Sequence, residues 1–165
     1  MAKDQSFDVV SQVDMQEVDN AVQQTVKELA QRYDLKGTGS TVSFDRAAGT
    51  ISLTAPSDFV LGQVKDILDS KLVRRGIDLM ALDWGKIEAG SGGTARRTAT
   101  VVNGIDAEIA RRINKEVRDQ KFKVKVQIEG DKLRIFSASR DELQAVIAFI
   151  KEHDYGIPLQ FTNYR

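Results

Sequence analysis

The sequence predicts an α+β fold built as a tandem of two similar units, each with a four-stranded antiparallel sheet that carries two helices on one face. Three observations lead to this prediction. Short stretches of alternating apolar and polar residues, typical of half-buried strands, flank longer segments with apolar residues at helical spacing. The order strand, helix, strand, strand, helix, strand occurs twice along the 165 residues. The apolar positions of the two halves also coincide when the halves are overlaid.

The first predicted strand and helix are marked by alternation and by a helix-capping pattern. Phe7, Val9 and Val13 alternate with polar residues, which indicates a strand. Asp14 is followed by Glu17 after three residues, a capping-box pattern that opens a helix running to about residue 33. The buried face of this helix is expected to consist of residues at helical spacing: Val18, Val22, Val26 or Thr25, Leu29 and Tyr33.

The rest of the first half contains a hairpin, a second helix and a further strand. Short apolar stretches at 42–44 and 51–53 flank a turn at 45–49. Ser57 is expected to cap a helix whose apolar residues recur at helical spacing. Gly76 stands where a helix commonly ends in the left-handed conformation, and strand character returns over 79–87.

The second half repeats this order. Ile105, Ile109, Ile113 and Val117 recur at helical spacing, and Ser139 with Glu142 three residues later forms another capping box. The predicted elements are a strand at about 98–102, a helix at 105–119, strands at 122–128 and 133–135 around a turn at 129–131, a helix after Ser139, and a strand at 159–161.

Overlaying the halves supports a repeat. At an offset of 82 residues, Ile51 and Leu53 fall on Leu133 and Ile135, and the helix cap Ser57 falls on Ser139. The apolar positions of the helices that follow coincide as well. Each β-α-β-β-α-β unit is therefore expected to be ferredoxin-like, with antiparallel strands and both helices on one face of the sheet. The other face is left open to solvent or to a partner.

The charges are unevenly distributed along a chain of zero net charge. Residues 1–90 contain ten Lys/Arg and fourteen Asp/Glu, whereas residues 91–165 contain fourteen and ten. The change falls at the glycine-rich segment 90–94, which predicts a domain boundary, the alternative being a long surface loop within one domain. The first strand is able to pair in either half. The domains are then either 1–90 and 95–165, or 16–92 and a discontinuous domain of 1–15 with 96–165.

Strand alternation places basic residues on the open sheet face of the second half. If the apolar residues face the helices, the alternate positions face the other way, and cations together with an aromatic ring suit phosphate neutralisation and base stacking. The residues expected there are Lys121, Lys123, Lys125, Gln127, Lys132, Arg134 and Phe136, joined by Arg96, Thr98 and Thr100. Arg111, Lys115 and Arg118 add a basic stripe on the helix 105–119. Solvated surface lysines are the alternative interpretation.

The usual enzyme and cofactor signatures are missing from the sequence. There is no cysteine, and the single histidine, His153, leaves no basis for a multi-histidine metal site. No P-loop pattern or dinucleotide fingerprint occurs, and no serine or threonine has the context of an activated nucleophile. The longest apolar run, 145–150, is too short to span a bilayer, and the start does not resemble a signal peptide. We expect a cytoplasmic protein that is not an enzyme and uses no metal or cofactor.

Several segments together resemble the YajQ family. They are SFDVVS (6–11) with Asp14, RYDLKG (32–37), KLVRRGID (71–78), IEGD (128–131), RDELQ (140–144) with VIA (146–148), and PLQFTNYR (158–165). The resemblance implies a bacterial cytosolic nucleotide-binding protein built as a tandem of RNP-like domains, without catalytic or metal residues. It also implies that the N-terminal strand completes the C-terminal domain, which favours 16–92 and 1–15 with 96–165. The implied partners are a nucleotide, such as cyclic di-GMP, GTP or ATP, or RNA, and a transcription regulator.

Together, the basic second half and this resemblance predict a non-enzymatic protein that binds a nucleotide, RNA or cyclic di-GMP through a basic face and regulates transcription. The residues expected to meet phosphates or to stack on bases are Arg96, Arg97, Arg111, Lys115, Lys123, Lys125, Arg134, Phe136 and Tyr164. The alternative is a protein-interaction adaptor without a nucleotide ligand, because two halves of opposite charge also suit docking to partners.

Overall fold

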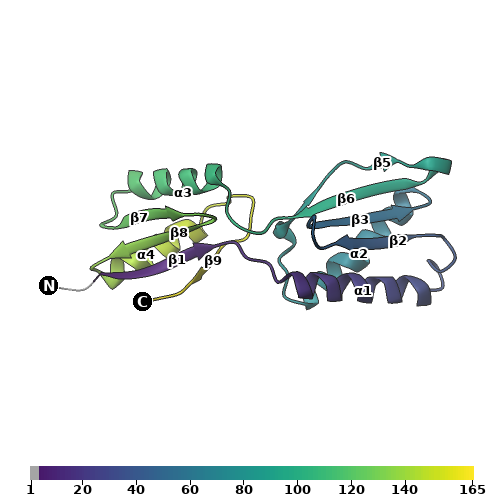
Figure 1. The fold of residues 1–165 in the computed structure, drawn as a ribbon, viewed down its shortest axis with the longest axis horizontal. Helices are drawn as coiled ribbons and strands as arrows, with labels where there is room; N and C mark the ends of the chain where they lie inside the picture. Colours follow the sequence, from purple (N-terminus) through teal and green to yellow (C-terminus); the bar gives the residue numbers. More distant parts are fainter. Residues whose placement is uncertain (1–3) are drawn as a thin grey trace. The chain divides into compact units, whose positions relative to one another are not determined.

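The computed structural model describes residues 4–165 and divides the chain into two compact units (Figure 1). The central unit is Val13–Val102, and the terminal unit combines the residues up to Gln12 with Asn103–Arg165. Each unit has an antiparallel sheet with helices packed on it, so the predicted α+β class is confirmed.

The terminal unit follows the expected β-α-β-β-α-β order, with its first strand supplied by the start of the chain. Its elements are β1 (Gln5–Val10), α3 (Ala107–Asp119), β7 (Lys125–Glu129), β8 (Lys132–Ser137), α4 (Arg140–Lys151) and β9 (Gln160–Thr162). Within residues 4–165, the strand order of this sheet is β7-β8-β1-β9, and β1, purple in Figure 1, lies between the green β8 and the yellow β9. Phe7 lies opposite Ile135 and Val9 opposite Phe161, which fixes the register.

The core of the terminal unit lies between this sheet and its two helices. Phe7, Val9, Leu133 and Ile135 are fully buried on the face that the helices cover. The ring of Phe7 packs edge-on against that of Phe161, with 6.0 Å between ring centroids. Burying side chains of this size is the main favourable contribution to folding of so small a unit.

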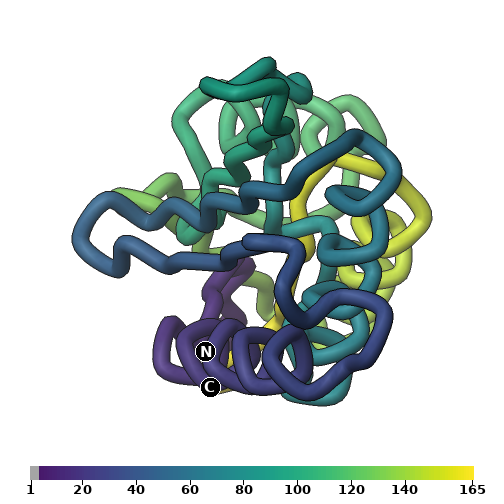
Figure 2. Tube along the Cα trace, turned by 90° about the vertical axis from the view of Figure 1, so that its right-hand side faces the viewer, coloured from purple at the N-terminus to yellow at the C-terminus, as the bar shows by residue number. Residues whose placement is uncertain are grey.

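The central unit has the same sheet order but starts from a different element. Its elements are α1 (Met15–Gln31), β2 (Thr41–Asp45), β3 (Thr50–Ala55), α2 (Asp58–Arg74), β4 (Leu82–Trp84), β5 (Glu88–Ala89) and β6 (Ala95–Val101). Within the described chain the order is β2-β3-β6-β4, with β5 paired to β6. Figure 2 shows the β2–β3 hairpin as a blue loop, closed by a bond from Gly49 N–H to the carbonyl of Asp45 (2.8 Å). The unit is a circular permutation, in which β6 takes the place that β1 has in the terminal unit.

The assignment of the strand near residue 98 to the second domain is wrong. Ala99 lies opposite Ile51 on β3 and opposite Trp84 on β4, so β6 belongs to the central sheet. Ala95, Ala99 and Val101 are buried in the central core. Alternation predicts that a segment is a strand, but the identity of its neighbours depends on long-range packing.

The glycine-rich segment expected to separate two domains is a turn within the central unit. It connects β5 to β6, and the N–H of Gly90 donates to the carbonyl of Thr94 (2.7 Å). Gly92 and Gly93 have φ angles of 71° and 80°, a left-handed conformation that glycine adopts without steric cost. Glycines that suit a flexible linker suit a tight turn equally well.

The observed division almost removes the charge asymmetry. The central unit has eleven Lys/Arg and twelve Asp/Glu, and the terminal unit has thirteen and twelve. Arg96 and Arg97 lie in the central unit with β6, while Asp4 and Asp8 lie in the terminal unit with β1. Neither unit is therefore strongly basic, and any basic binding surface depends on how charges are arranged locally.

The helices begin at the residues that the capping patterns indicate. The Asp14 side chain accepts from the backbone N–H groups of Gln16 (3.0 Å) and Glu17 (3.3 Å). Ser57 and Ser139 cap α2 and α4 by accepting from the N–H three residues later, at 3.2 Å and 3.3 Å. Among residues 4–165, no helix combines the length and the apolar character that a membrane span requires.

Two details differ from the predicted pattern. In α1, Thr25 is fully buried and its hydroxyl donates to the carbonyl of Ala21 (2.8 Å), while Val26 is 46% exposed and Tyr33 is 92% exposed. The strand predicted at 122–128 begins only at Lys125, and Lys121, with a left-handed φ of 60°, lies in the turn that follows α3. Lys121 and Lys123 therefore do not lie on a strand.

Replacing Phe7 by alanine should destabilise the terminal unit by about 3–5 kcal/mol, because a fully buried ring is lost from the central strand of its sheet. Trp84, the single tryptophan, reports on the central unit. In chemical unfolding of Phe7→Ala, circular dichroism should show a transition at a lower denaturant concentration than in the wild type. The midpoint measured by tryptophan fluorescence should not change. Ile51→Ala, in the central core, is the matched control and should move that midpoint. An equal movement in Phe7→Ala would show that the two cores do not unfold separately.

Candidate functional site

The open face of the terminal sheet carries polar and charged side chains at the positions that alternation predicts. Asp8 on β1 lies opposite Arg134 on β8, which in turn lies opposite Gln127 on β7. Two residues further along β8, on the same open face, Phe136 lies opposite Lys125. An aromatic ring and several cations therefore share this face, as expected.

Asp8 lies at the centre of the open face and binds two of these cations. Its side chain is only 4% exposed. One carboxylate oxygen accepts from Nε of Arg134 (2.9 Å), and the other accepts from Nζ of Lys132 (3.2 Å) and Nδ2 of Asn163 (2.9 Å). Arg134 also lies 3.7 Å from a carboxylate oxygen of Glu129. Much of the positive charge on this face is thus neutralised within the sheet.

The pKa of Asp8 reflects this arrangement. Burial alone raises the pKa, but the hydrogen bonds from Arg134, Asn163 and Lys132 outweigh it and lower the pKa from 3.8 to about 2. Asp8 consequently stays ionised at neutral pH and holds both cations. Lys125 forms no ion pair within residues 4–165 and is the cation on this face best able to meet a ligand.

The structure does not bring the nine predicted binding residues together. Lys125, Arg134 and Phe136 share the open face, and Lys123 immediately precedes β7. Arg111 and Lys115 are exposed on α3, on the side of the sheet that the helices cover.

Arg96 and Arg97 lie on β6 of the central unit and already have partners there. Arg96 pairs with Glu88 at 3.1 Å. Nε of Arg97 donates to the carbonyl of Gly85 (2.7 Å), and its guanidinium lies 5.4 Å from the ring centroid of Trp84. Their expected place on the basic face is wrong, because β6 completes the other sheet.

Tyr164 lies away from the open face, in a pocket of about 460 Å³ at the N-terminus of α4. Its ring centroid is 6.2 Å from that of Phe7, whose side chain points toward the helices. We call this the Tyr164 pocket; its lining consists of Gln5, Ser6, Arg140, Leu143, Gln144, Tyr164 and Arg165.

Three elements far apart in sequence build the Tyr164 pocket. Ser6 and Arg165 exchange two backbone hydrogen bonds (3.0 and 3.3 Å), which hold the end of the chain beside β1. Ser139 caps α4, and this places Arg140 and Gln144, four residues apart, on one side of its first turns. Tyr164 is 61% exposed.

The chemistry of the Tyr164 pocket suits an anionic ligand with a flat ring. Arg140 and Arg165 take part in no ion pair within the described residues. Gln5 and Gln144 offer amide donors and acceptors, and no Asp or Glu lines the pocket. Sequence reasoning found Tyr164 but missed the two arginines, whose only signal was Arg140 next to a helix cap.

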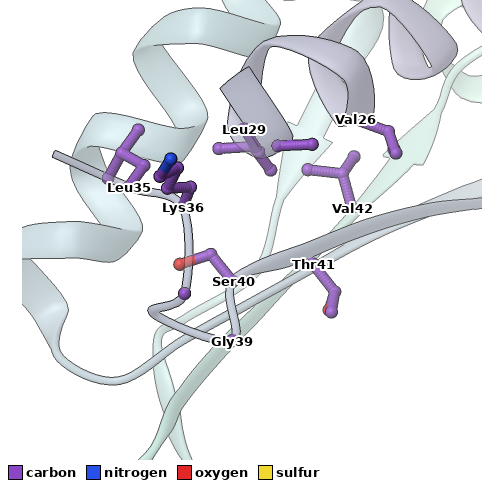
Figure 3. Close-up of a pocket in the computed structure, with 10 residues that line it drawn as sticks. Val26, Leu29, Leu35, Lys36, Gly39, Ser40, Thr41 and Val42 are labelled. Atoms are coloured by element: carbon purple, nitrogen blue, oxygen red, sulfur yellow. The ribbon is translucent and has the colours of Figure 1, made fainter. Parts of the chain in front are cut away.

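A second pocket, of about 590 Å³, lies between α1, the loop 35–40 and β2 in the central unit (Figure 3). The side chains of Val26 and Val42 point toward one another there, and Thr41 points away from them. Val26 is exposed because it lines this pocket rather than the core. Lys36 is its one charged lining residue, so the pocket is less suited to a phosphate-bearing ligand than the Tyr164 pocket.

These features define an α+β protein of two ferredoxin-like units with open sheet faces and ligand-sized pockets. Comparison with known proteins identifies the group more closely. The family described as "Nucleotide-binding protein YajQ-like" matches residues 5–165. A protein of Acidithiobacillus ferrooxidans, named "Nucleotide-binding protein", is 50% identical over 160 residues, which are 97% of this chain and 98% of that protein.

Two further relatives match along the entire chain. A protein of the same name from Alkaliphilus oremlandii is 50% identical over 165 residues, and a nucleotide-binding protein of Bacillus cereus is 46% identical over 165 residues. Both alignments cover 100% of each chain. The chain belongs to the YajQ-like family, as the sequence motifs indicated.

Replacing Asp8 by asparagine should lower the free energy of unfolding by about 2 kcal/mol at neutral pH, which corresponds to the pKa shift from 3.8 to about 2. Because the folded-state pKa is depressed, the stabilisation is present above about pH 4 and is lost as the pH falls toward 2. Urea unfolding at several pH values should therefore show a flatter profile between pH 4 and 2 for Asp8→Asn. Asp4→Asn, an exposed carboxylate nearby, should keep the wild-type profile. Identical profiles for both variants would contradict the role of Asp8.

Proposed function

We propose that this chain is a nucleotide-binding protein and that the Tyr164 pocket holds the nucleotide. The observation that carries the proposal is that the exposed Tyr164 lines one pocket together with Arg140 and Arg165, two arginines without an ion pair within residues 4–165. Aromatic side chains stack on bases, and arginine pairs with phosphate groups in a bidentate manner, so this combination suits a nucleotide. The relatives named as nucleotide-binding proteins, which share about half of their residues with this chain, support the ligand class.

The pocket's size and polarity are consistent with a ligand of this kind. Its volume of about 460 Å³ falls in the range of small-molecule sites. In the proposed arrangement the base stacks on Tyr164 and the phosphates contact the two arginines, near the positive end of the α4 dipole. The side-chain amides of Gln5 and Gln144 meet polar edges of the base or the ribose hydroxyls. Cyclic di-GMP, GTP and ATP are the candidates to compare.

RNA binding is a second candidate function, for the open face of the terminal sheet. The specific observation is that Phe136 and the unpaired Lys125 lie opposite one another, with Arg134 on the same face. A ring flanked by cations suits a single-stranded nucleic acid, whose bases stack and whose phosphates pair. Because Asp8 holds Arg134 and Lys132, we expect this face to contribute less to affinity than the Tyr164 pocket.

We further propose that the protein binds its nucleotide without converting it. His153 is exposed at the end of α4, where its Nδ1 lies 2.7 Å from the carbonyl of Phe149. No Asp, Glu, His or Lys side chain lines the Tyr164 pocket, and no group of three His, Asp or Glu within residues 4–165 is arranged to hold a metal ion. Control of a transcription regulator stays a prediction. The small charge difference between the units removes most of the basis for the adaptor alternative.

Replacing Tyr164 by alanine should raise the Kd for the bound nucleotide by about 5- to 150-fold, the range expected when a stacking ring is lost. Isothermal titration with cyclic di-GMP, GTP and ATP measures the effect. Tyr33→Ala is the matched control, because Tyr33 is 92% exposed in the central unit. Arg140→Gln should also weaken binding. Equal affinities in wild type, Tyr164→Ala and Arg140→Gln would refute the proposed site.

Salt dependence separates the two candidate ligands. A nucleotide in the Tyr164 pocket contacts few phosphates, so its affinity should fall gently as salt rises, whereas RNA binding should weaken steeply. Lys125→Gln should affect only the RNA titration, if RNA uses the open face.

A further inference from the structure

The central unit contains a second concave site, formed between α1 and α2. We call it the α1–α2 cleft; it has a volume of about 320 Å³ and is lined by Gln24, Lys27, Glu28, Gln31, Lys71, Arg74 and Arg75. Its residues are spaced three or four apart on each helix, so each set forms one face. The cleft lies wholly within the central unit and shares no residue with the Tyr164 pocket.

The charge of this cleft differs from that of the unit that contains it. The central unit has one more acidic than basic residue, yet the cleft gathers four cations around a single carboxylate. Lys71 and Arg74 lie three residues apart in the last turn of α2, and Arg75 follows as its C-cap. Like charges at this spacing destabilise one another. A bound anion would relieve this repulsion.

Internal ion pairs satisfy only part of the positive charge. Nζ of Lys71 lies 2.9 Å from a carboxylate oxygen of Glu28, and this hydrogen bond lowers the pKa of Glu28. Arg75 lies 3.5 Å from Glu17, outside the cleft lining. Lys27 and Arg74 are exposed and form no ion pair within residues 4–165.

The position of these cations is not explained by the helix dipole alone. Basic residues at the end of α2 complement its negative C-terminal pole, which accounts for Lys71, Arg74 and Arg75. Lys27 lies in the interior of α1 and faces the same cleft, accompanied by the amide side chains of Gln24 and Gln31. Two helices therefore present cationic and neutral hydrogen-bond donors to one space.

We propose that the α1–α2 cleft is a phosphate-binding site, separate from the Tyr164 pocket. A phosphate group has three oxygens and a high negative charge. It therefore fits a site with several converging donors better than a ligand with a single carboxylate does. Lys27 and Arg74 supply the free charges, while Lys71 and Arg75 reorient from their glutamate partners or share them. The phosphate group belongs either to an inorganic polyphosphate or to a nucleotide.

The test compares a cleft variant with a charge-matched control in the same unit. Lys27→Gln/Arg74→Gln removes the two free cations, and Arg46→Gln/Lys86→Gln removes one Lys and one Arg that do not line the cleft. Pyrophosphate is titrated into the full-length protein and followed by backbone amide shifts of α1 and α2. The wild type and the control should bind with similar Kd, and the cleft variant should bind at least about tenfold more weakly. Equal weakening in both variants, or none in either, overturns the proposal.

Further arms distinguish the phosphate source and the two proposed sites. Adenosine should not change the backbone amide shifts of α1 and α2. If adenosine changes them as much as ATP does, the cleft does not recognise phosphate and the proposal is wrong. If pyrophosphate binds as well as ATP, the cleft reads the phosphate alone. Tyr164→Ala should leave pyrophosphate binding to the cleft unchanged. The proposal for the Tyr164 pocket and the proposal for the cleft can therefore be refuted independently. An unchanged Trp84 fluorescence midpoint shows that the cleft variant is folded.

Discussion

The terminal unit depends on one strand pairing: β1, from the start of the sequence, fills the space between β8 and β9. Without it, these two strands have no hydrogen-bonded neighbour between them, and the core loses Phe7 and Val9. The same pairing positions groups on both sides of the sheet. It sets Asp8 opposite Arg134 on the open face, and it holds Arg165 beside Ser6 at the Tyr164 pocket. Fold and candidate site therefore share one cause.

Two clusters of charged residues in this protein differ in how many of their cations are paired with carboxylates. On the open face, the nearly buried Asp8 accepts hydrogen bonds from two cations and an amide, so the cluster is complete without a ligand. In the α1–α2 cleft, one carboxylate faces four cations, so positive charge is left over. Counting basic residues along the chain does not distinguish these cases, because the count ignores which partner each cation already has.

In the central unit, the corresponding inner position of the sheet is filled by a strand from the end of that unit. β6 occupies the inner position of the sheet, where Ala95 and Ala99 contact the core through small side chains. This leaves two arginines of β6 on a unit whose overall charge is slightly negative. The tight turn at Gly92 and Gly93 makes the close return from β5 to β6 sterically feasible.

The sequence by itself determined the types and order of most elements, the helix starts and the α+β class. These depend on local spacing: a cap such as Ser57 or Ser139 bonds an N–H three residues away, and apolar periodicity is visible within one segment. Only the tertiary structure decided which strands pair and which side chains meet. Arg140 and Tyr164 share a pocket through contacts between distant segments, and strand pairing between such segments leaves no mark in the local pattern of either.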